Sequence, residues 1–126
     1  LQDRQYRLAD MDSERILVFI RSRAATPALK QALGRVRALQ QKRADLDRRL
    51  ERIERQRERA AADQDRMRSN MRAVTRQSPD YRRYADKLGR LEDRIEELEQ
   101  QQTELQQKRS EAERALKEAL DGLSVP

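Results

Sequence analysis

Two pairs of closely spaced carboxylates are the residues of this 126-residue chain that most nearly resemble a chemical site. Asp10 and Asp12 form one pair, and Asp63 and Asp65 form the other. Carboxylate oxygens bind Ca²⁺ and Mg²⁺ well, but a site needs several ligands that converge on the ion. Neither pair has a third ligand close to it, and the chain contains no His and no Cys. We therefore expect no metal site and no cofactor.

The Ser and Lys residues lack the groups that would make them reactive. A serine nucleophile needs an adjacent base, and a catalytic lysine needs an apolar pocket around its amine. The chain has no His to serve as the base, and it is 41% charged and only 3% aromatic. The sequence therefore predicts a protein that is not an enzyme.

An arginine-rich stretch between positions 48 and 59 suggests binding to a polyanion. The formal net charge of the chain is +6 and its isoelectric point is near 10.1, which favours contact with nucleic acid. However, Glu51, Glu54 and Glu58 interrupt the arginines at helical spacing, and the stretch has no aromatic residue on which a base could stack. We favour a solvated helix face with internal ion pairs, and a nucleic-acid-binding arm is the alternative.

A second candidate surface lies on both sides of the dipeptide Ser78–Pro79. Tyr and Arg, together with Met, are typical of adaptable protein contact surfaces. In the alternative interpretation, which we favour, the tyrosines only fill the space between two helices. The residues of this candidate contact surface are Arg66, Arg68, Asn70, Tyr81, Arg83 and Tyr84.

Two long helices must position these residues. Positions that favour apolar side chains recur at steps of three and four residues before and after Ser78–Pro79, which is typical of a coiled coil. Before the dipeptide these positions include Leu29, Ala32, Val36, Leu39, Leu46, Leu50, Ile53, Ala60, Met67, Met71 and Val74. After it they include Tyr81, Tyr84, Leu88, Leu91, Ile95, Leu98, Leu105, Ala112, Leu116, Ala119 and Leu123.

The helix boundaries follow from two similar start signals. Thr26–Pro27 and Ser78–Pro79 each place an N-cap residue before a proline at the first helical position. We expect helices over about 26–77 and 79–121, with Gly122 ending the second. Because the connection is very short, the two helices must be antiparallel. The predicted fold is all-α: a long antiparallel two-helix coiled-coil hairpin with a short N-terminal helical segment.

Charged and polar residues in the predicted core fix the register of the two helices. If Val74 pairs with Tyr81, each core arginine faces an apolar position that has a carboxylate on both sides. A long guanidinium side chain can cross to such a carboxylate. The polar core residues are Arg43, Arg57, Gln64, Gln102 and Arg109. The predicted carboxylate partners are Glu97 and Glu99 for Arg57, Asp45 and Asp47 for Arg109, and Glu111 and Glu113 for Arg43.

The charge distribution also favours pairing within the chain. Residues 27–77 contain 15 Lys and Arg against 7 Asp and Glu, whereas residues 78–126 contain 9 against 12. At the end far from the turn, Leu33 and Leu120 widen the apolar stripe. An N-terminal segment, a missing neighbouring domain or a second copy of the chain would cover this stripe.

Residues 1–25 do not share the heptad repeat, and we expect them to form a cap or connector with a strand end, a turn and a short helix. For residues 13–22 a strand is the alternative to the helix, because the run Ile16–Ile20 favours either. The hairpin would occupy residues 26–122, and residues 123–126 would be a frayed tail. No apolar run is long enough to span a membrane. The chain begins with Leu1, so we expect a fragment, and its cellular location is not predicted.

Several segments resemble the C-terminal part of an uncharacterised bacterial family, the mucoidy-inhibitor-like proteins. The segments are Tyr6–Asp12, Ile16–Ile20, Thr26–Leu33, Asp63–Met71 and Arg83–Leu88. The resemblance covers nearly the whole chain, and its most specific parts flank the predicted turn. It implies a β-rich domain upstream, a coiled-coil tail and a bacterial source. It implies no catalytic or ligand-binding residue.

These observations predict a non-catalytic coiled-coil arm of a larger bacterial protein, with a structural or protein-interaction role. Its partner would be its own upstream domain, another protein or a second copy of the chain. Besides nucleic-acid binding, the remaining alternative is a homo-oligomerisation module in which two hairpins form a four-helix bundle through the wide apolar stripe.

Overall fold

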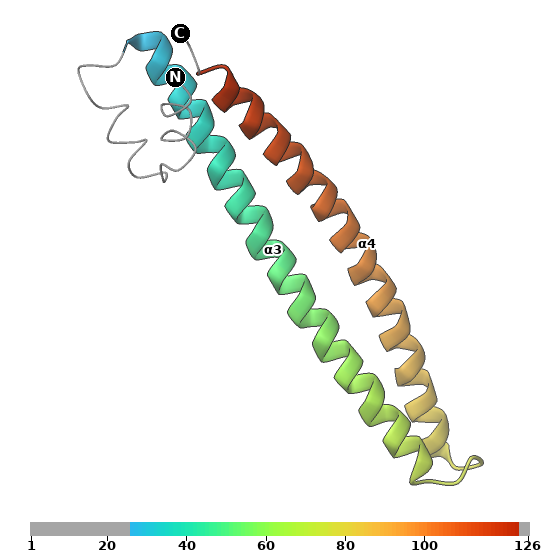
Figure 1. The fold of residues 1–126 in the computed structure, drawn as a ribbon. Coiled ribbons are helices and arrows are strands. Elements are labelled where there is room, and N and C mark those ends of the chain that lie inside the picture. The colour runs from blue at the N-terminus through green and yellow to red at the C-terminus, as the bar shows by residue number, and fades with distance from the viewer. Residues whose placement is uncertain (1–25, 124–126) are drawn as a thin grey trace. The chain divides into compact units, whose positions relative to one another are not determined.

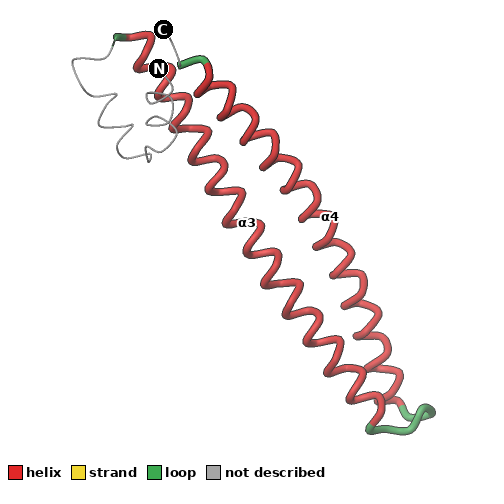
Figure 2. Tube along the Cα trace, viewed as in Figure 1, coloured by secondary structure: helices red, strands yellow, loops and turns green. Residues whose placement is uncertain are grey.

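The computed structural model describes residues 26–123, and in this range the chain is an all-α helical hairpin (Figure 1). Helix α3 spans Pro27–Arg72 and helix α4 spans Pro79–Asp121. Between them, residues 73–78 form a loop, and the described range contains no strand (Figure 2). The predicted cap segment over residues 1–25, including the choice between helix and strand at 13–22, lies outside the described residues.

Both helices begin where the sequence predicts, and by the same mechanism. The hydroxyl oxygen of Thr26 accepts a hydrogen bond from the backbone N–H of Leu29 at 3.1 Å. The hydroxyl of Ser78 accepts from the N–H of Tyr81, also at 3.1 Å. Each cap satisfies a backbone donor that has no partner within its helix. The proline that follows each cap loses nothing there, because the first helical N–H needs no acceptor in the helix.

Helix α3 ends five residues before its predicted end near Gln77. The sequence after Arg72 is Ala-Val-Thr, and β-branched residues are weak helix formers. The chain must also cross from one helix axis to another, a distance of about 8–10 Å, before Pro79 can start α4. Three hydrogen bonds hold the loop. Ala73 N–H donates to the carbonyl of Asn70 at 3.2 Å, and the carbonyl of Thr75 accepts from the N–H of Ser78 at 3.1 Å and from its hydroxyl at 2.7 Å.

Helix α4 ends at Asp121, as predicted, but Gly122 does not adopt a left-handed conformation. The N–H of Gly122 donates to the carbonyl of Glu118 at 3.0 Å, and that of Leu123 donates to Leu120 at 3.0 Å. The helix therefore closes with a tighter last turn. Leu123, which we assigned to a frayed tail, packs against the buried residues described next, whereas residues 124–126 lie outside the described range.

The chain divides into two compact units, and each contains a segment of both helices. In the first, which we call the terminal unit, the described residues are 26–47 and 107–123. Its buried cluster consists of Leu33, Val36 and Leu116, with Leu29, Leu39, Ala119, Leu120 and Leu123 packed against it. Leu46 and Ala112 are also buried in this unit. The complete burial of Leu33 agrees with the widened apolar stripe that the sequence predicts.

The second unit, which we call the turn unit, spans residues Arg48–Gln106 and includes the loop. Its buried side chains are Ile53, Ala60, Met67 and Leu98. All four occupy positions of the predicted heptad, so the 3.5-residue periodicity identifies the face of each helix that packs on its partner. Within the described residues no helix is long and apolar enough to cross a membrane.

Candidate contact surface at the turn

A polar network joins the two helices inside the turn unit. Arg57 Nη1 donates a hydrogen bond to Gln102 Oε1 at 2.7 Å, and Arg57 Nη2 lies 3.5 Å from Glu99 Oε1. Glu54 joins both partners, because its Oε2 lies 3.5 Å from Arg57 Nη1 and accepts from Gln102 Nε2 at 3.4 Å. The contact with Glu99 is the one that the register predicts. The contact between the two polar core residues is one that the sequence analysis missed.

A second polar contact joins the helices inside the terminal unit. Arg109 Nε donates to an oxygen of Asp47, and Arg109 Nη1 lies 3.0 Å from Glu113 Oε1 on the same helix. The hydrogen bond that Arg109 donates to Asp47, the charge of Asp47 and the charge of Glu113 together raise the pKa of Arg109. Asp47 is one of the two predicted partners of this arginine, so the predicted register is correct at this position as well.

Of the other two polar core residues, Arg43 does not pair with the carboxylates that we predicted for it, and no partner was predicted for Gln64. Arg43 and Gln64 are half-buried, but within the described range neither makes an ion pair or a side-chain hydrogen bond. Glu113, one of the expected partners of Arg43, is engaged by Arg109 instead. Glu113 lies one helical turn from Arg109 on α4, a spacing at which side chains of opposite charge meet. Arg57 and Arg109 therefore bond to the opposite helix through their side chains, whereas Arg43 does not within the described residues.

At the turn, the predicted contact residues are arranged by short ion pairs within each helix. Arg66 Nη2 lies 2.5 Å from Asp63, Arg68 Nη1 lies 3.3 Å from Asp65, and Arg83 Nη2 lies 2.8 Å from Asp80. All three arginines remain exposed, and the guanidinium carbon of Arg83 lies 5.6 Å from the ring centre of Tyr84. The backbone carbonyl of Asn70 accepts a hydrogen bond from the N–H of Ala73 in the loop.

A hollow of about 580 Å³ opens beside the loop, lined by both helices and by loop residues. Its apolar residues, Met71, Val74, Tyr81 and Leu88, are all half-buried. Its other lining residues are Arg68, Arg72 and Arg76, all of them exposed, and no carboxylate lines it. We call this group of seven residues the turn groove.

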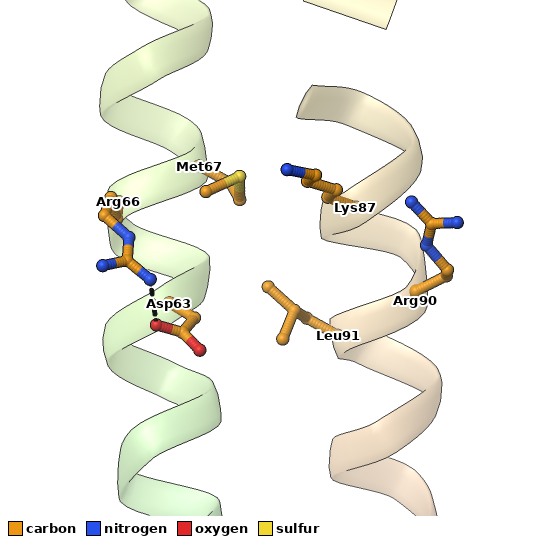
Figure 3. Close-up of a pocket in the computed structure, with 6 residues that line it drawn as sticks. All are labelled: Asp63, Arg66, Met67, Lys87, Arg90 and Leu91. Atoms are coloured by element: carbon orange, nitrogen blue, oxygen red, sulfur yellow. Dashed lines mark hydrogen bonds and ion pairs between the residues drawn. The ribbon is translucent and has the colours of Figure 1, made fainter. Parts of the chain in front are cut away.

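A smaller hollow of about 310 Å³ lies farther along the same unit (Figure 3). Leu91 and Lys87 of α4 point toward α3, where Met67 points back toward them, whereas Arg90 lies on the side of α4 away from α3. Arg66 and Asp63 form their ion pair on the α3 side. This hollow is therefore lined by two apolar side chains together with three cations and one carboxylate.

The cations around these two hollows are only partly neutralised. Together the hollows are lined by six cationic side chains and one carboxylate. Carboxylates pair with Arg66 and Arg68, but within the described residues Arg72, Arg76, Lys87 and Arg90 form no ion pair. Arg72 donates only to the hydroxyl of Ser69, at 3.2 Å. A net positive charge therefore surrounds the apolar residues.

The structure brings together only part of the contact surface that the sequence predicts. Arg68 and Tyr81 line the turn groove and Arg66 lines the smaller hollow, whereas Asn70, Arg83 and Tyr84 line neither. Arg72, Val74 and Arg76 were not among the predicted contact residues, because all three lie within the predicted helix that continues to Gln77. The early end of α3 puts Val74 and Arg76 in the loop. The consecutive β-branched residues Val74 and Thr75, which are weak helix formers, are the signal that could have identified them.

Three carboxylates near the turn lie in ion pairs with arginines of the same helix. In the described part of the chain, no three His, Cys, Asp or Glu residues are placed to hold a metal ion. The carboxylates of Asp63 and Asp65 are each engaged by an arginine. Comparison with known proteins finds no matching family model, no matching curated protein and no matching solved structure.

Proposed function

We propose that this chain is a non-catalytic arm that presents a protein-contact surface at its turn. The single observation that carries the proposal is the turn groove, in which half-buried apolar residues lie beside three exposed arginines without any lining carboxylate. Arginine and aromatic residues around an apolar centre are typical of protein contact surfaces.

The two polar contacts between the helices support a structural role for the rest of the arm. A buried or half-buried polar residue at a core position favours one register over others, because a slipped register leaves it without a partner. Arg57 with Gln102 and Arg109 with Asp47 are contacts of this kind, one in each unit. The proposal includes a coiled-coil geometry for the helices, supported by the heptad positions of the buried side chains.

We propose further that the arm belongs to a larger bacterial protein of the mucoidy-inhibitor-like type. The support is the resemblance of the segments on both sides of the turn, Asp63–Met71 and Arg83–Leu88. Several residues of these segments line the two hollows, namely Arg66, Met67, Arg68, Met71, Lys87 and Leu88. A contact role would explain why the resemblance is most specific there.

Photocrosslinking in the cells that produce the protein tests the contact role. The photoreactive residue benzoylphenylalanine replaces Arg76 in the loop in one variant, and it replaces Arg55 in the other. Both arginines are exposed and within the described residues neither forms an ion pair, so the two positions are matched. We expect a protein adduct of defined mass from position 76 and none from position 55.

Three results of this experiment would contradict the proposal. Equal adducts from both positions would mean that the turn is not a preferred surface. An absence of any adduct from position 76 would mean that the turn contacts nothing in the cell. An adduct that nuclease removes would transfer support to the nucleic-acid-binding alternative.

A further inference from the structure

We infer that the partner of the turn groove is an acidic protein segment that carries large apolar side chains. This inference rests on the proposed function and adds the chemistry of the ligand. It follows from two properties of the groove, namely an apolar lining that needs cover and a cationic rim that lacks counter-charges.

The apolar lining requires side chains rather than phosphates. Met71, Val74, Tyr81 and Leu88 are only half-buried, so part of their apolar surface is open to water. Covering such surface contributes about 25 cal/mol for each Å² removed from water. The hollow is open to solvent, and its volume of about 580 Å³ has room for anchoring side chains.

The arginines around the groove favour a partner that carries negative charge. Arg72 and Arg76 are exposed and form no ion pair within the described residues, and no carboxylate lines the groove. A basic partner would place like charges together at a cost, whereas Asp or Glu side chains would form charge-assisted hydrogen bonds with the guanidinium groups. Arginine is well suited to this role because its planar fork matches a carboxylate.

A nucleic acid fits the same groove less well. Single-stranded nucleic acid binds where successive bases stack on aromatic side chains along a basic track. The groove contains one aromatic residue, Tyr81, and three aliphatic or thioether side chains that offer no stacking surface. The lining therefore favours a peptide with aliphatic or aromatic anchors over a chain of bases.

Selection of peptides from a random library tests the inference. The immobilised 126-residue chain selects from displayed 16-residue peptides, after the library has been depleted on the variant Arg72→Glu/Arg76→Glu. We expect the selected peptides to be rich in Asp and Glu and to carry at least two large apolar residues. Neutral or basic selected peptides would overturn the inference, as would a failure to enrich any sequence.

Affinity measurements on one selected peptide locate the site. Fluorescence anisotropy at physiological salt should show at least a tenfold loss for Arg72→Glu/Arg76→Glu. A change within twofold is expected for the control Arg52→Glu/Arg55→Glu, which alters the charge of exposed α3 arginines by the same amount outside the groove. Val74→Ser, a loop substitution in the apolar lining, should weaken binding several-fold. Equal losses in the two charge-reversal variants would refute the location.

A single-stranded oligonucleotide of 16 thymidines is the competing probe. We expect it to bind more weakly than the peptide and with a steeper dependence on salt. Tighter binding of the oligonucleotide, lost in Arg72→Glu/Arg76→Glu, would replace the acidic peptide by a nucleic acid. If crosslinking at position 76 yields a protein adduct but no acidic peptide is selected, the contact role stands and only the inferred chemistry fails.

Discussion

Arg57 and Gln102 are both polar residues at core positions, and they hydrogen-bond to each other across the two helices at 2.7 Å. The arginine also approaches Glu99, while Glu54 joins the pair from the side of α3. The arginine is 32% exposed in its side chain, so the network lies at the edge of the core. A shift of the helices by one heptad would separate Arg57 from Gln102.

A double-mutant cycle measures this contact. Arg57→Ala, Gln102→Ala and the double variant should give a coupling free energy of about 1 kcal/mol in urea unfolding followed by circular dichroism. The expected value is modest because water screens the partly exposed arginine. Strict additivity of the two single substitutions would mean that the hydrogen bond does not contribute to stability.

Replacing both residues by leucine tests the role of the polar layer in register. Arg57→Leu/Gln102→Leu should raise the melting temperature, because apolar residues pack better at core positions. It should also permit other pairings, which light scattering would detect as a mixture of monomer and larger species. A more stable variant that remains a single species would show that the apolar residues alone specify the register.

Two exposed glutamates of α4 differ in their contacts: Glu99 forms an ion pair with Arg57, and Glu104 is the comparison. Glu99→Lys should lower the free energy of unfolding by about 0.5–1 kcal/mol, because it places a second cation beside Arg57. Glu104→Lys makes the same charge change at an exposed position that has no ion pair in the described part of the chain. It should change the stability by less than half as much. Equal effects would contradict the observed register.

Exchanging Arg109 and Asp47 should destabilise the hairpin less than reversing the charge of either residue alone. Arg109→Asp and Asp47→Arg should each lower the melting temperature, and the variant that carries both should recover part of the loss. The raised pKa of Arg109 means that its contribution is complete below the unfolded-state value and disappears only as the pH rises above it. The difference in melting temperature between the wild-type chain and Arg109→Ala should therefore be the same at pH 7 and pH 10. A smaller difference at pH 10 would be inconsistent with this contact.

The start of α4 depends on one side chain. Ser78→Ala removes the acceptor for the N–H of Tyr81 and should cost about 1 kcal/mol. Ser110→Ala is the matched control, because Ser110 is an exposed residue inside α4 that caps nothing. Alanine is the better helix former there, so this substitution should be neutral or slightly stabilising. Similar losses in both variants would argue against the cap.

Burial in the turn unit predicts different costs for two leucines of α4. Leu98 is completely buried, and Leu98→Ala should destabilise the hairpin by about 2–3 kcal/mol. Leu105 occupies an equivalent heptad position but is only half-buried, so Leu105→Ala should cost clearly less. Urea unfolding of both variants decides the order, and a reversed order would mean that the helices pack on different faces.

The sequence by itself determined the helical hairpin. The heptad repeat identifies the packed faces, the two cap–proline dipeptides identify the helix starts, and the short connection requires antiparallel helices. These signals are local or periodic, so they accumulate over many residues and remain reliable without knowledge of the tertiary contacts. The contacts of Arg57 with Glu99 and of Arg109 with Asp47 also follow from the repeat, because a register fixes which residues lie opposite each other.

Only the tertiary structure decided the details at the turn and the choice of polar partners. Arg109 engages Glu113, Arg43 does not, and Arg57 selects Gln102 in addition to Glu99. A long charged side chain reaches several partners whose energies differ by less than about 1 kcal/mol, so sequence spacing cannot rank them. The end of α3 at Arg72 likewise depends on the space that the chain needs to reverse direction. That early end creates the turn groove, and with it the surface on which the proposed function depends.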